Sequence, residues 1–329
     1  MNIAIDAMGG DHAPQEPVKG AIDALKHIDA HMVLIGDEDQ IHQELKKYTY
    51  DTSRVSVVHT TEIITGEDKP VVAIKRKKDS SMVVGLLQLK NQEIDGFVSA
   101  GNTGALLAGG LLRVGRIKGI DRPALCSVYP TSKGMSILTD AGANADCKPR
   151  NLLEFGIMGS LYAQNVLGMN NPRVGLANIG HEEGKGNALV IEAYDLLKEA
   201  NLNFVGNVEA RDIPEGATDI IVCDGFTGNV ILKLSEGVVK SFSSMMKKVF
   251  MKSPLTKVAA LLVKNGLGEM KKNMDYTEYG GAPLLGVKGL VVKAHGSSNA
   301  KAFMNAIRYA EKAAASGVVE KIAAEVQAS

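Results

Sequence analysis

Short apolar runs alternate with longer segments of helical periodicity along almost the whole chain. The apolar runs are hydrophobic at successive positions, so both faces of each expected strand should be buried. The expected strands are residues 2–6, 32–36, 54–59, 96–100, 124–130, 135–139, 173–179, 203–208, 219–224 and 290–295. The expected helices are residues 15–29, 38–47, 81–91, 103–114, 149–167, 187–200, 228–250, 254–274 and 298–326. This alternation predicts an α/β fold with a mostly parallel sheet that helices cover on both faces.

At one place, two expected strands follow each other without a helix between them. Residues 124–130 and 135–139 are joined by the short polar segment 131–134, which is typical of a β-hairpin. An antiparallel pair within a mostly parallel sheet predicts a mixed sheet. No linker, repeat or low-complexity tract divides the chain, so we expect one domain over residues 1–329, with a helical excursion at about 228–274.

Composition and charge narrow the range of functions. The 37 Lys and Arg residues balance 37 Asp and Glu residues, which argues against general nucleic-acid binding. Tryptophan is absent and aromatic residues make up 5% of the chain, which argues against an aromatic platform for sugars or bases. Three scattered cysteines fit neither a disulfide framework nor a zinc site, so we expect reduced thiols and a cytoplasmic protein. We expect the first residues to form a strand and not a signal peptide, and we expect any membrane contact to be peripheral.

Small and polar residues follow the carboxyl ends of six expected strands. In open α/β sheets, ligands bind at these ends. Glycine lets backbone N–H groups approach a ligand, and a following helix directs free N–H groups and the positive end of its dipole toward it. Tight turns alone do not account for six such loops, so the sequence predicts a site for phosphate or a similar anion. The candidate binding residues are Gly9, Gly10, Asp11, His12, Gly101, Asn102, Thr103, Gly104, Asp140, Asn144, His181, Asp224, Thr227, Gly228, His295, Ser297 and Asn299, together with Lys185 and Asn229 as candidates for catalysis.

Two of these loops precede apolar helices, and Thr103 and Thr227 are the expected N-caps. Neither common nucleotide motif is present. The glycines of segment 180–185 are one residue closer than in a P-loop, and the dinucleotide glycine fingerprint is absent after the first strand. Nucleotide binding is therefore disfavoured.

A metal site stays open as an alternative. It could use Asp6, Asp11 and His12, or Asp140 and Asp146. No zinc or calcium ligand spacing accompanies these residues, so we expect neither a metal nor a cofactor. No serine or cysteine nucleophile motif is present either.

Taken together, the loops resemble one family. The motifs are DAMGGDHAP at 6–14, SAGNTGA at 99–105, DAGAN at 140–144, GHEEGK at 180–185, DGFTGN at 224–229 and KAHGSSN at 293–299. This set, which extends over essentially the whole chain, resembles the bacterial phosphate acyltransferases of phospholipid synthesis (the PlsX family).

The resemblance implies a three-layer α/β/α sandwich, related to the isocitrate and isopropylmalate dehydrogenases, and a homodimer with long helices at its interface. It implies reversible transfer of a long-chain fatty acyl group from the thioester of acyl carrier protein to inorganic phosphate. The acyl phosphate would pass to a membrane glycerol-3-phosphate acyltransferase, so the enzyme is expected in the cytoplasm, at the inner face of the cell membrane. The alternatives are a phosphotransacetylase for short acyl-CoA, a dehydrogenase of the related fold, and a membrane-associated scaffold without activity.

The residues fit the implied chemistry. Phosphate is itself a nucleophile, so the site has to hold a dianion, orient it and stabilise a tetrahedral oxyanion. Lys185 and Asn229 offer a positive charge and a neutral N–H donor at neighbouring strand ends, and the resemblance points to the same two residues. The acid that protonates the leaving thiolate could be His12, His181 or His295.

Segment 247–272 departs from the neutral charge of the chain, with seven lysines and one glutamate. Within it, Leu255, Val258 and Leu262 follow helical spacing and form an apolar face opposite two lysines. A basic amphipathic helix predicts binding to an anionic membrane surface, with docking of the acidic carrier protein or contact within a dimer as alternatives. The basic run between Arg113 and Arg122 is a second candidate for carrier docking.

Overall fold

The computed structural model describes residues 1–273 and 280–328, which form two sheets flanked by helices. The first sheet has the order β3 (Val55–His59), β2 (His31–Gly36), β1 (Asn2–Asp6), β4 (Gly96–Ser99), β12 (Leu290–Lys293), β11 (Ala282–Leu285) and β5 (Ala124–Leu125). The second has the order β6 (Ser127–Thr131), β7 (Gly134–Thr139), β10 (Ile220–Val222), β8 (Val174–Asn178) and β9 (Phe204–Glu209). Pairing is parallel except along β11 and between β6 and β7. The predicted α/β class, mixed pairing and hairpin are confirmed.

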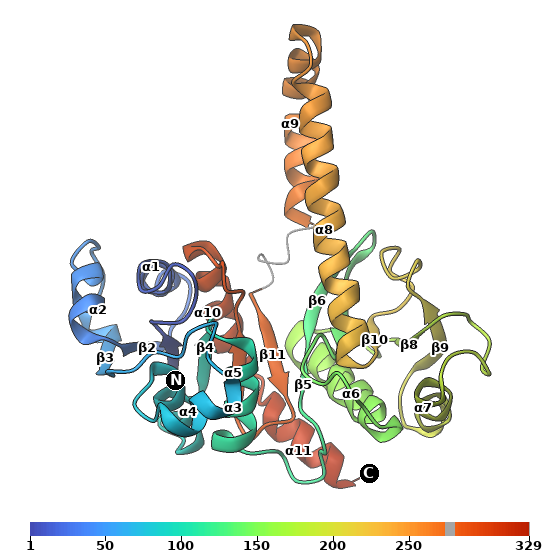
Figure 1. The fold of residues 1–329 in the computed structure, drawn as a ribbon, viewed down its shortest axis with the longest axis horizontal. Coiled ribbons are helices and arrows are strands. Elements are labelled where there is room, and N and C mark those ends of the chain that lie inside the picture. The colour runs from blue at the N-terminus through green and yellow to red at the C-terminus, as the bar shows by residue number, and fades with distance from the viewer. Residues whose placement is uncertain (274–279, 329) are drawn as a thin grey trace.

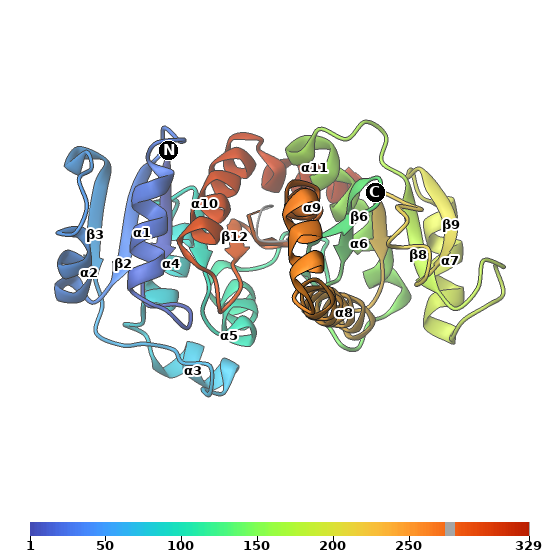
Figure 2. The same ribbon diagram turned by 90° about the horizontal axis from the view of Figure 1, so that it is seen from above.

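Helices cover both faces of the first sheet because its strands are apolar at successive positions. Ile3 and Ile5 of β1 belong to the cluster that contains the buried faces of α1 (Gln15–Ala24), α2 (Glu38–Leu45) and α10 (Ala300–Ala315). Ala4, between them, packs on the other face with α3 (Pro70–Arg76), α4 (Ser81–Lys90) and α5 (Thr103–Gly109). Figure 2 shows the groups of elements that belong to the two sheets lying side by side.

The second sheet is covered in the same way. Ile220 and Val222 of β10 pack with α6 (Pro149–Tyr162) and α7 (Ala188–Glu199). Ile221, which points to the other face, packs near the first turns of α8 (Gly225–Phe250). The last helix, α11 (Val318–Ala328), follows α10 after Gly317, whose φ of +64° ends the helix expected over 298–326.

The expected strand 124–130 contributes to both sheets. It divides at Cys126: β5 pairs with β11 in the first sheet, and β6 pairs with β7 in the second. The run is apolar on both sides of Ser127, and a single serine does not mark a division between two strands. The division depends on β11, a strand that was not expected and that lies far away in the sequence. The chain therefore passes from one sheet to the other at a buried cysteine.

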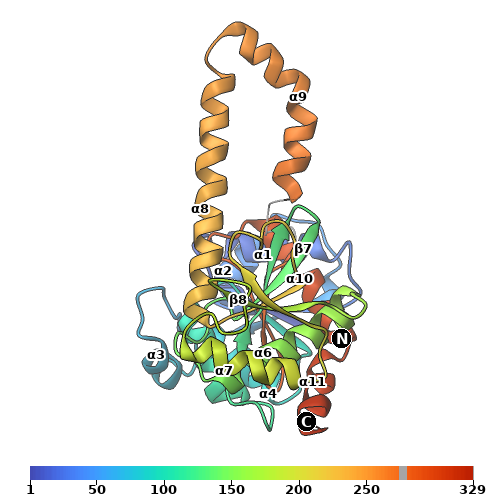
Figure 3. The same ribbon diagram turned by 90° about the vertical axis from the view of Figure 1, so that its right-hand side faces the viewer.

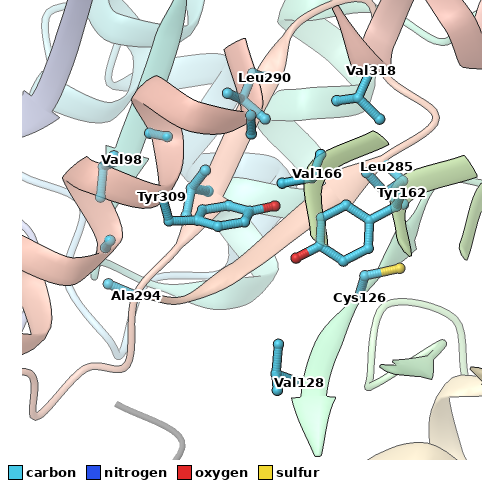
Figure 4. Packing of buried hydrophobic residues seen from close by; sticks show 14 of the residues in the cluster. Val98, Cys126, Val128, Tyr162, Val166, Leu285, Leu290, Ala294, Tyr309 and Val318 are labelled. Atoms are coloured by element: carbon cyan, nitrogen blue, oxygen red, sulfur yellow. The ribbon is translucent and has the colours of Figure 1, made fainter. Parts of the chain in front are cut away.

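A hydrophobic cluster contains side chains from both sheets. Tyr162 of α6 and Tyr309 of α10 lie edge to face, with ring centroids 6.2 Å apart. Figure 4 shows Cys126 beside Tyr162, and Leu290 of β12 belongs to the same cluster. That the chain is a single domain stays a prediction.

The helical excursion expected at 228–274 is present as two helices. The 26-residue helix α8 is followed by α9 (Pro254–Asn273), and the pair projects away from the sheets (Figures 1 and 3). None of the described helices is both long and apolar enough to cross a membrane.

Candidate functional site

Three loops meet at the carboxyl ends of β1, β4 and β12, which are neighbours in the first sheet. The N–H of Asp11 donates to the carbonyl oxygen of Gly296 over 2.8 Å. Gly10 has a φ of +105°, and a Cβ on Gly9 would lie 2.9 Å from the Gly101 nitrogen. The loops therefore pack backbone against backbone, which side chains at these glycines would prevent.

The buried carboxylate of Asp6 lies beneath these loops. It accepts hydrogen bonds from the Ser81 and Ser99 hydroxyls, each over 2.6 Å. Burial raises the pKa of Asp6, although the two serine hydroxyls oppose this shift. With both of its oxygens bonded to serines, Asp6 serves to join β1, β4 and α4.

Asp140 organises the corresponding loops of the second sheet. One of its oxygens accepts the N–H groups of residues 125, 142 and 143, and the other accepts the backbone and side-chain N–H groups of Asn144. Burial raises the pKa of Asp140 despite these bonds. The Asn144 carbonyl accepts the Gly225 N–H over 2.7 Å, which ties this loop to the start of α8. Asp140 and Asn144 thus hold the loop that borders the site.

The helix caps differ from the expected ones. Asn102 caps α5 by accepting the Ala105 N–H over 3.0 Å, and Asp224 caps α8 by accepting the Thr227 N–H over 2.9 Å. The predicted caps Thr103 and Thr227 are wrong, because both residues already lie in the first turn of their helix. The Thr227 hydroxyl donates to Asp224, which strengthens that cap.

A cavity of about 300 Å³ lies between the loops of the two sheets. Three of the predicted site residues line it, namely Thr103 at the start of α5, Asn229 in the second turn of α8, and His295 after β12. Gly142, held by Asp140, forms part of its wall, as does an ion pair of α8, Lys233 with Glu236, whose charged atoms are 2.8 Å apart. Residues from both sheets are thus brought to one concave surface.

The other predicted residues lie around this cavity. The loop after β8 holds Lys185, which is exposed, and His181, whose Nε2 is 3.2 Å from an Asp212 oxygen. Neither residue lines the cavity, although β8 is the neighbour of β10, which leads to Asn229. Asn299 caps α10, and the Ser297 hydroxyl is 2.9 Å from Nδ1 of His295.

Asp11 and His12 are exposed at the end of β1, and Gly104 packs against Pro70. Within the described ranges, no group of three or more His, Cys, Asp or Glu side chains is arranged to hold a metal ion. The expectation that no metal takes part stays a prediction.

Comparison with known proteins identifies the family. Residues 1–321 match the model of a family described as "fatty acid synthesis protein". A phosphate acyltransferase of Alkaliphilus oremlandii is 62% identical over 322 residues, which cover 98% of this chain and 96% of the relative. The chain belongs to this family of phosphate acyltransferases. The Clostridioides difficile phosphate acyltransferase is 55% identical, over 98% of this chain and 95% of the relative. The resemblance seen in the loop motifs is confirmed.

Solved structures support the fold. A phosphotransacetylase from Streptococcus pyogenes aligns with a TM-score of 0.62 at 16% identity, covering 95% of this chain and 94% of that one. A branched-chain phosphotransacylase from Enterococcus faecalis aligns with a TM-score of 0.58 at 15% identity, covering 95% and 99%. At such identities the likeness concerns the fold alone.

Among the cavity residues of this phosphate acyltransferase that were not predicted, one is a buried lysine. Lys293, the last residue of β12, lines the cavity although its exposed fraction is 9%. Burial lowers its pKa to about 8. The sequence does contain a signal for this residue, namely a lysine at the end of an apolar strand. A lysine that such a strand buries seldom lacks a partner or a function. Lys293 stands first in the motif KAHGSSN, of which His295, Ser297 and Asn299 were the predicted site residues.

The arrangement suits an anion and a reacting carbonyl. The cavity combines the buried cation of Lys293, the amide of Asn229, the glycine loop at Gly142 and the first turns of α8. A cation attracts phosphate, and a neutral amide can stabilise an oxyanion. Burial and the charge of Lys233 lower the pKa of His295, so its ring is mainly neutral at pH 7.

Proposed function

We propose that this phosphate acyltransferase reversibly transfers a long-chain fatty acyl group from the thioester of acyl carrier protein to inorganic phosphate. The product is an acyl phosphate for phospholipid synthesis. The observation that carries the proposal is the cavity between the two sheets, where strand-end loops, Asn229 and a buried lysine meet. Family membership supports phosphate as the acyl acceptor.

The proposed reaction needs no covalent enzyme intermediate. A phosphate oxygen attacks the thioester carbonyl, and the Asn229 amide donates to the developing oxyanion. Gly142 borders the phosphate position without donating to it, because its N–H is bonded to Asp140, and Lys185 contributes a positive charge from the neighbouring loop. Chemistry in this cavity therefore depends on orientation and charge, both of which the loops provide.

The carrier protein as donor is supported by exposed positive charge. All five lysines in residues 247–268 are exposed, and this stretch contains no acidic residue. In the second basic run, Arg116 pairs with Asp121, and Arg113 donates to the Ile74 carbonyl. We therefore favour the α8–α9 hairpin for electrostatic attraction of acidic partners.

The same hairpin supports a homodimer and a peripheral position at the inner face of the membrane. Apolar residues on α8 recur every three or four positions and are exposed: Phe226, Val230, Leu234, Val238, Phe242, Met245 and Val249. Such a stripe suits contact with a helix of a second copy of the chain.

On α9, the side chains of Leu255, Val258 and Leu262 are exposed by 80%, 55% and 83%. We propose that α8 forms the dimer contact and that α9 binds anionic lipid, so that the acyl phosphate reaches a membrane glycerol-3-phosphate acyltransferase.

The test is to incubate the purified protein with radiolabelled phosphate and either long-chain acyl carrier protein or acyl-CoA, and to measure the label recovered in acyl phosphate after extraction into organic solvent. We expect kcat/KM to be higher for the carrier-protein thioester. Activity on short acyl-CoA alone would indicate a phosphotransacetylase instead, and no product from any donor would refute acyl transfer.

A further inference from the structure

A buried lysine shares the wall of the cavity with the proposed oxyanion donor. Lys293 follows Val291 and Val292 of β12, which are fully buried, and it is itself 9% exposed. The same cavity is lined by Asn229 from α8 and His295 from the loop after β12. Lys293 is therefore at the reaction site, although its strand belongs to the core of the first sheet.

The contacts of Lys293 hold its amine without neutralising it. Nζ donates to the carbonyl oxygen of Ala100 over 3.3 Å and to that of Ala294. An ammonium group has three N–H donors, so these two bonds leave one of them for a ligand. No carboxylate of the described residues lies within ion-pair distance of Nζ.

The surrounding charges come from several elements. Asp6, the last residue of β1, and Asp11 in the loop after it favour the charged amine, whereas Lys233 of α8 disfavours it. Glu236 pairs with Lys233, and the ring of His295 is mainly neutral. Burial outweighs these charges and lowers the pKa of Lys293 to about 8. A purely structural lysine would be expected to pair with a carboxylate, since an unpaired buried charge is destabilising.

We propose that Lys293 is the general acid that protonates the sulfur of the departing carrier thiol. The proposal rests on the proposed acyl transfer and assigns one further step of it. An acid with a pKa near the working pH transfers protons most effectively, and Lys293 fits this better than His295, whose pKa is lowered from its ordinary value.

The step balances without another reactant. An oxygen of hydrogen phosphate forms the new C–O bond as the C–S bond breaks, and the proton of Nζ passes to the sulfur. The lone pair left on Nζ then takes the proton that hydrogen phosphate brought in. The products are the acyl phosphate dianion and a neutral thiol, and Lys293 is again an ammonium group.

The test compares leaving groups in the variant Lys293→Met. On the alkyl thioester of the carrier protein, the rate should fall by about 100-fold to 10,000-fold. On an acyl thioester of p-nitrothiophenol, whose thiolate leaves without a proton, the rate should fall less than about 10-fold, because general acid catalysis then adds little. Asn229→Ala is the matched control: an oxyanion donor serves both substrates, so this variant should slow both equally. Equal loss on both donors in Lys293→Met, or no loss, would overturn the proposal.

A second measurement uses the unaltered enzyme, so it does not depend on whether the variant folds. With the carrier thioester, kcat should fall as the pH rises above about 8, because the amine loses its proton. With the aryl thioester this alkaline limb should be absent, and an identical limb for both donors would overturn the proposal. If the unaltered enzyme forms no acyl phosphate from the carrier thioester, it is the proposed function that fails.

Discussion

At the scale of single residues, the site depends on glycines where two backbones touch. A Cβ on Gly228 would lie 1.9 Å from the Asp140 carbonyl oxygen, and one on Gly225 would lie 2.7 Å from the Asn144 nitrogen. The Asp140 loop cannot move aside easily, because five N–H groups converge on its carboxylate. The positions of Asn229 and Gly142 in the cavity therefore follow from the close backbone packing at Gly225 and Gly228.

We expect Gly228→Ala to lower the free energy of unfolding by at least about 2 kcal/mol, as overpacking against a fixed backbone does. It should also reduce activity. Gly237→Ala is the matched control on the same helix, since a Cβ there meets nothing within 4 Å. It should leave stability equal or slightly higher. Urea unfolding of both variants measures the difference, and equal stabilities would contradict the packing argument.

The catalytic assignment gives a second prediction. Asn229→Ala and Lys185→Ala should each lower kcat by roughly 100-fold, because each removes a donor that stabilises transferred charge. Both side chains make few structural contacts, so circular dichroism should be unchanged. Lys26→Ala, which removes a lysine with 71% side-chain exposure far from the loops, serves as the control. Near-normal turnover in a folded variant would remove that residue from the mechanism.

At the scale of elements, the two helices of the hairpin present different apolar surfaces. The stripe on α8 extends along the helix from the cavity outward, whereas the exposed apolar residues of α9 lie among lysines. The sequence left open whether segment 254–266 binds membrane or a second copy. With two surfaces available, each role can be tested separately.

For α9, Leu262→Glu should release the protein from anionic vesicles in a flotation assay. Burying one leucine contributes about 1.5–3 kcal/mol, and each nearby lysine adds about 1 kcal/mol, so binding is weak enough to be reversed by one charge and by high salt. Activity in solution should persist. Val205→Glu is the control, because Val205 is also exposed but lies on β9, and it should leave flotation unchanged. Unaltered flotation of Leu262→Glu would refute the anchor.

For α8, Phe242→Glu should convert the proposed dimer to a monomer in size-exclusion chromatography, because a buried, unpaired charge would face the second copy. Lys240→Glu alters an exposed residue on the opposite side of the same turns and should leave the dimer intact. A Phe242→Glu protein that stays dimeric would exclude the stripe as the interface.

At the scale of the whole molecule, the cavity exists because two sheets are held side by side. Strand ends of both sheets contribute to its wall, and the cluster around Tyr162 and Tyr309 joins the sheets. Burying Lys293 in this junction has a cost in stability that depends on pH. The folded protein holds this amine with a pKa of about 8, against 10.5 for an unperturbed lysine.

Between these two pH values the unfolded chain binds more protons at Lys293, so this group makes the free energy of unfolding rise with pH. The loss in the free energy of unfolding is fully present below pH 8. It amounts to about 3 kcal/mol, at 1.36 kcal/mol for each unit by which folding lowers the pKa of Lys293. We expect the unfolding free energy of the wild type, relative to Lys293→Met, to increase by about 2 kcal/mol between pH 8 and pH 10. A constant difference over this range in urea unfolding would show that the amine is not held with a lowered pKa.

The order of strands and helices could be predicted from the sequence because it depends on local properties. Apolar runs, helical periodicity and glycine-rich loops lie within segments of ten to twenty residues, and most expected elements are present within a few residues of their predicted ends. The loops that form the site could be identified for the same reason, and Thr103, Asn229 and His295 do line the cavity.

Other features depend on contacts between distant segments, and only the tertiary structure decided them. The division at Cys126 follows from its N–H bond to the Pro283 carbonyl, 157 positions away along the chain. The burial of Lys293 depends on the pairing of β12 with β4 and on the position of α8 across the cavity, neither of which the residues next to Lys293 in the sequence specify. Local patterns fix which elements form, because backbone and side-chain preferences act over a few residues. The pairing of those elements decides which polar side chains lose their water and face one another.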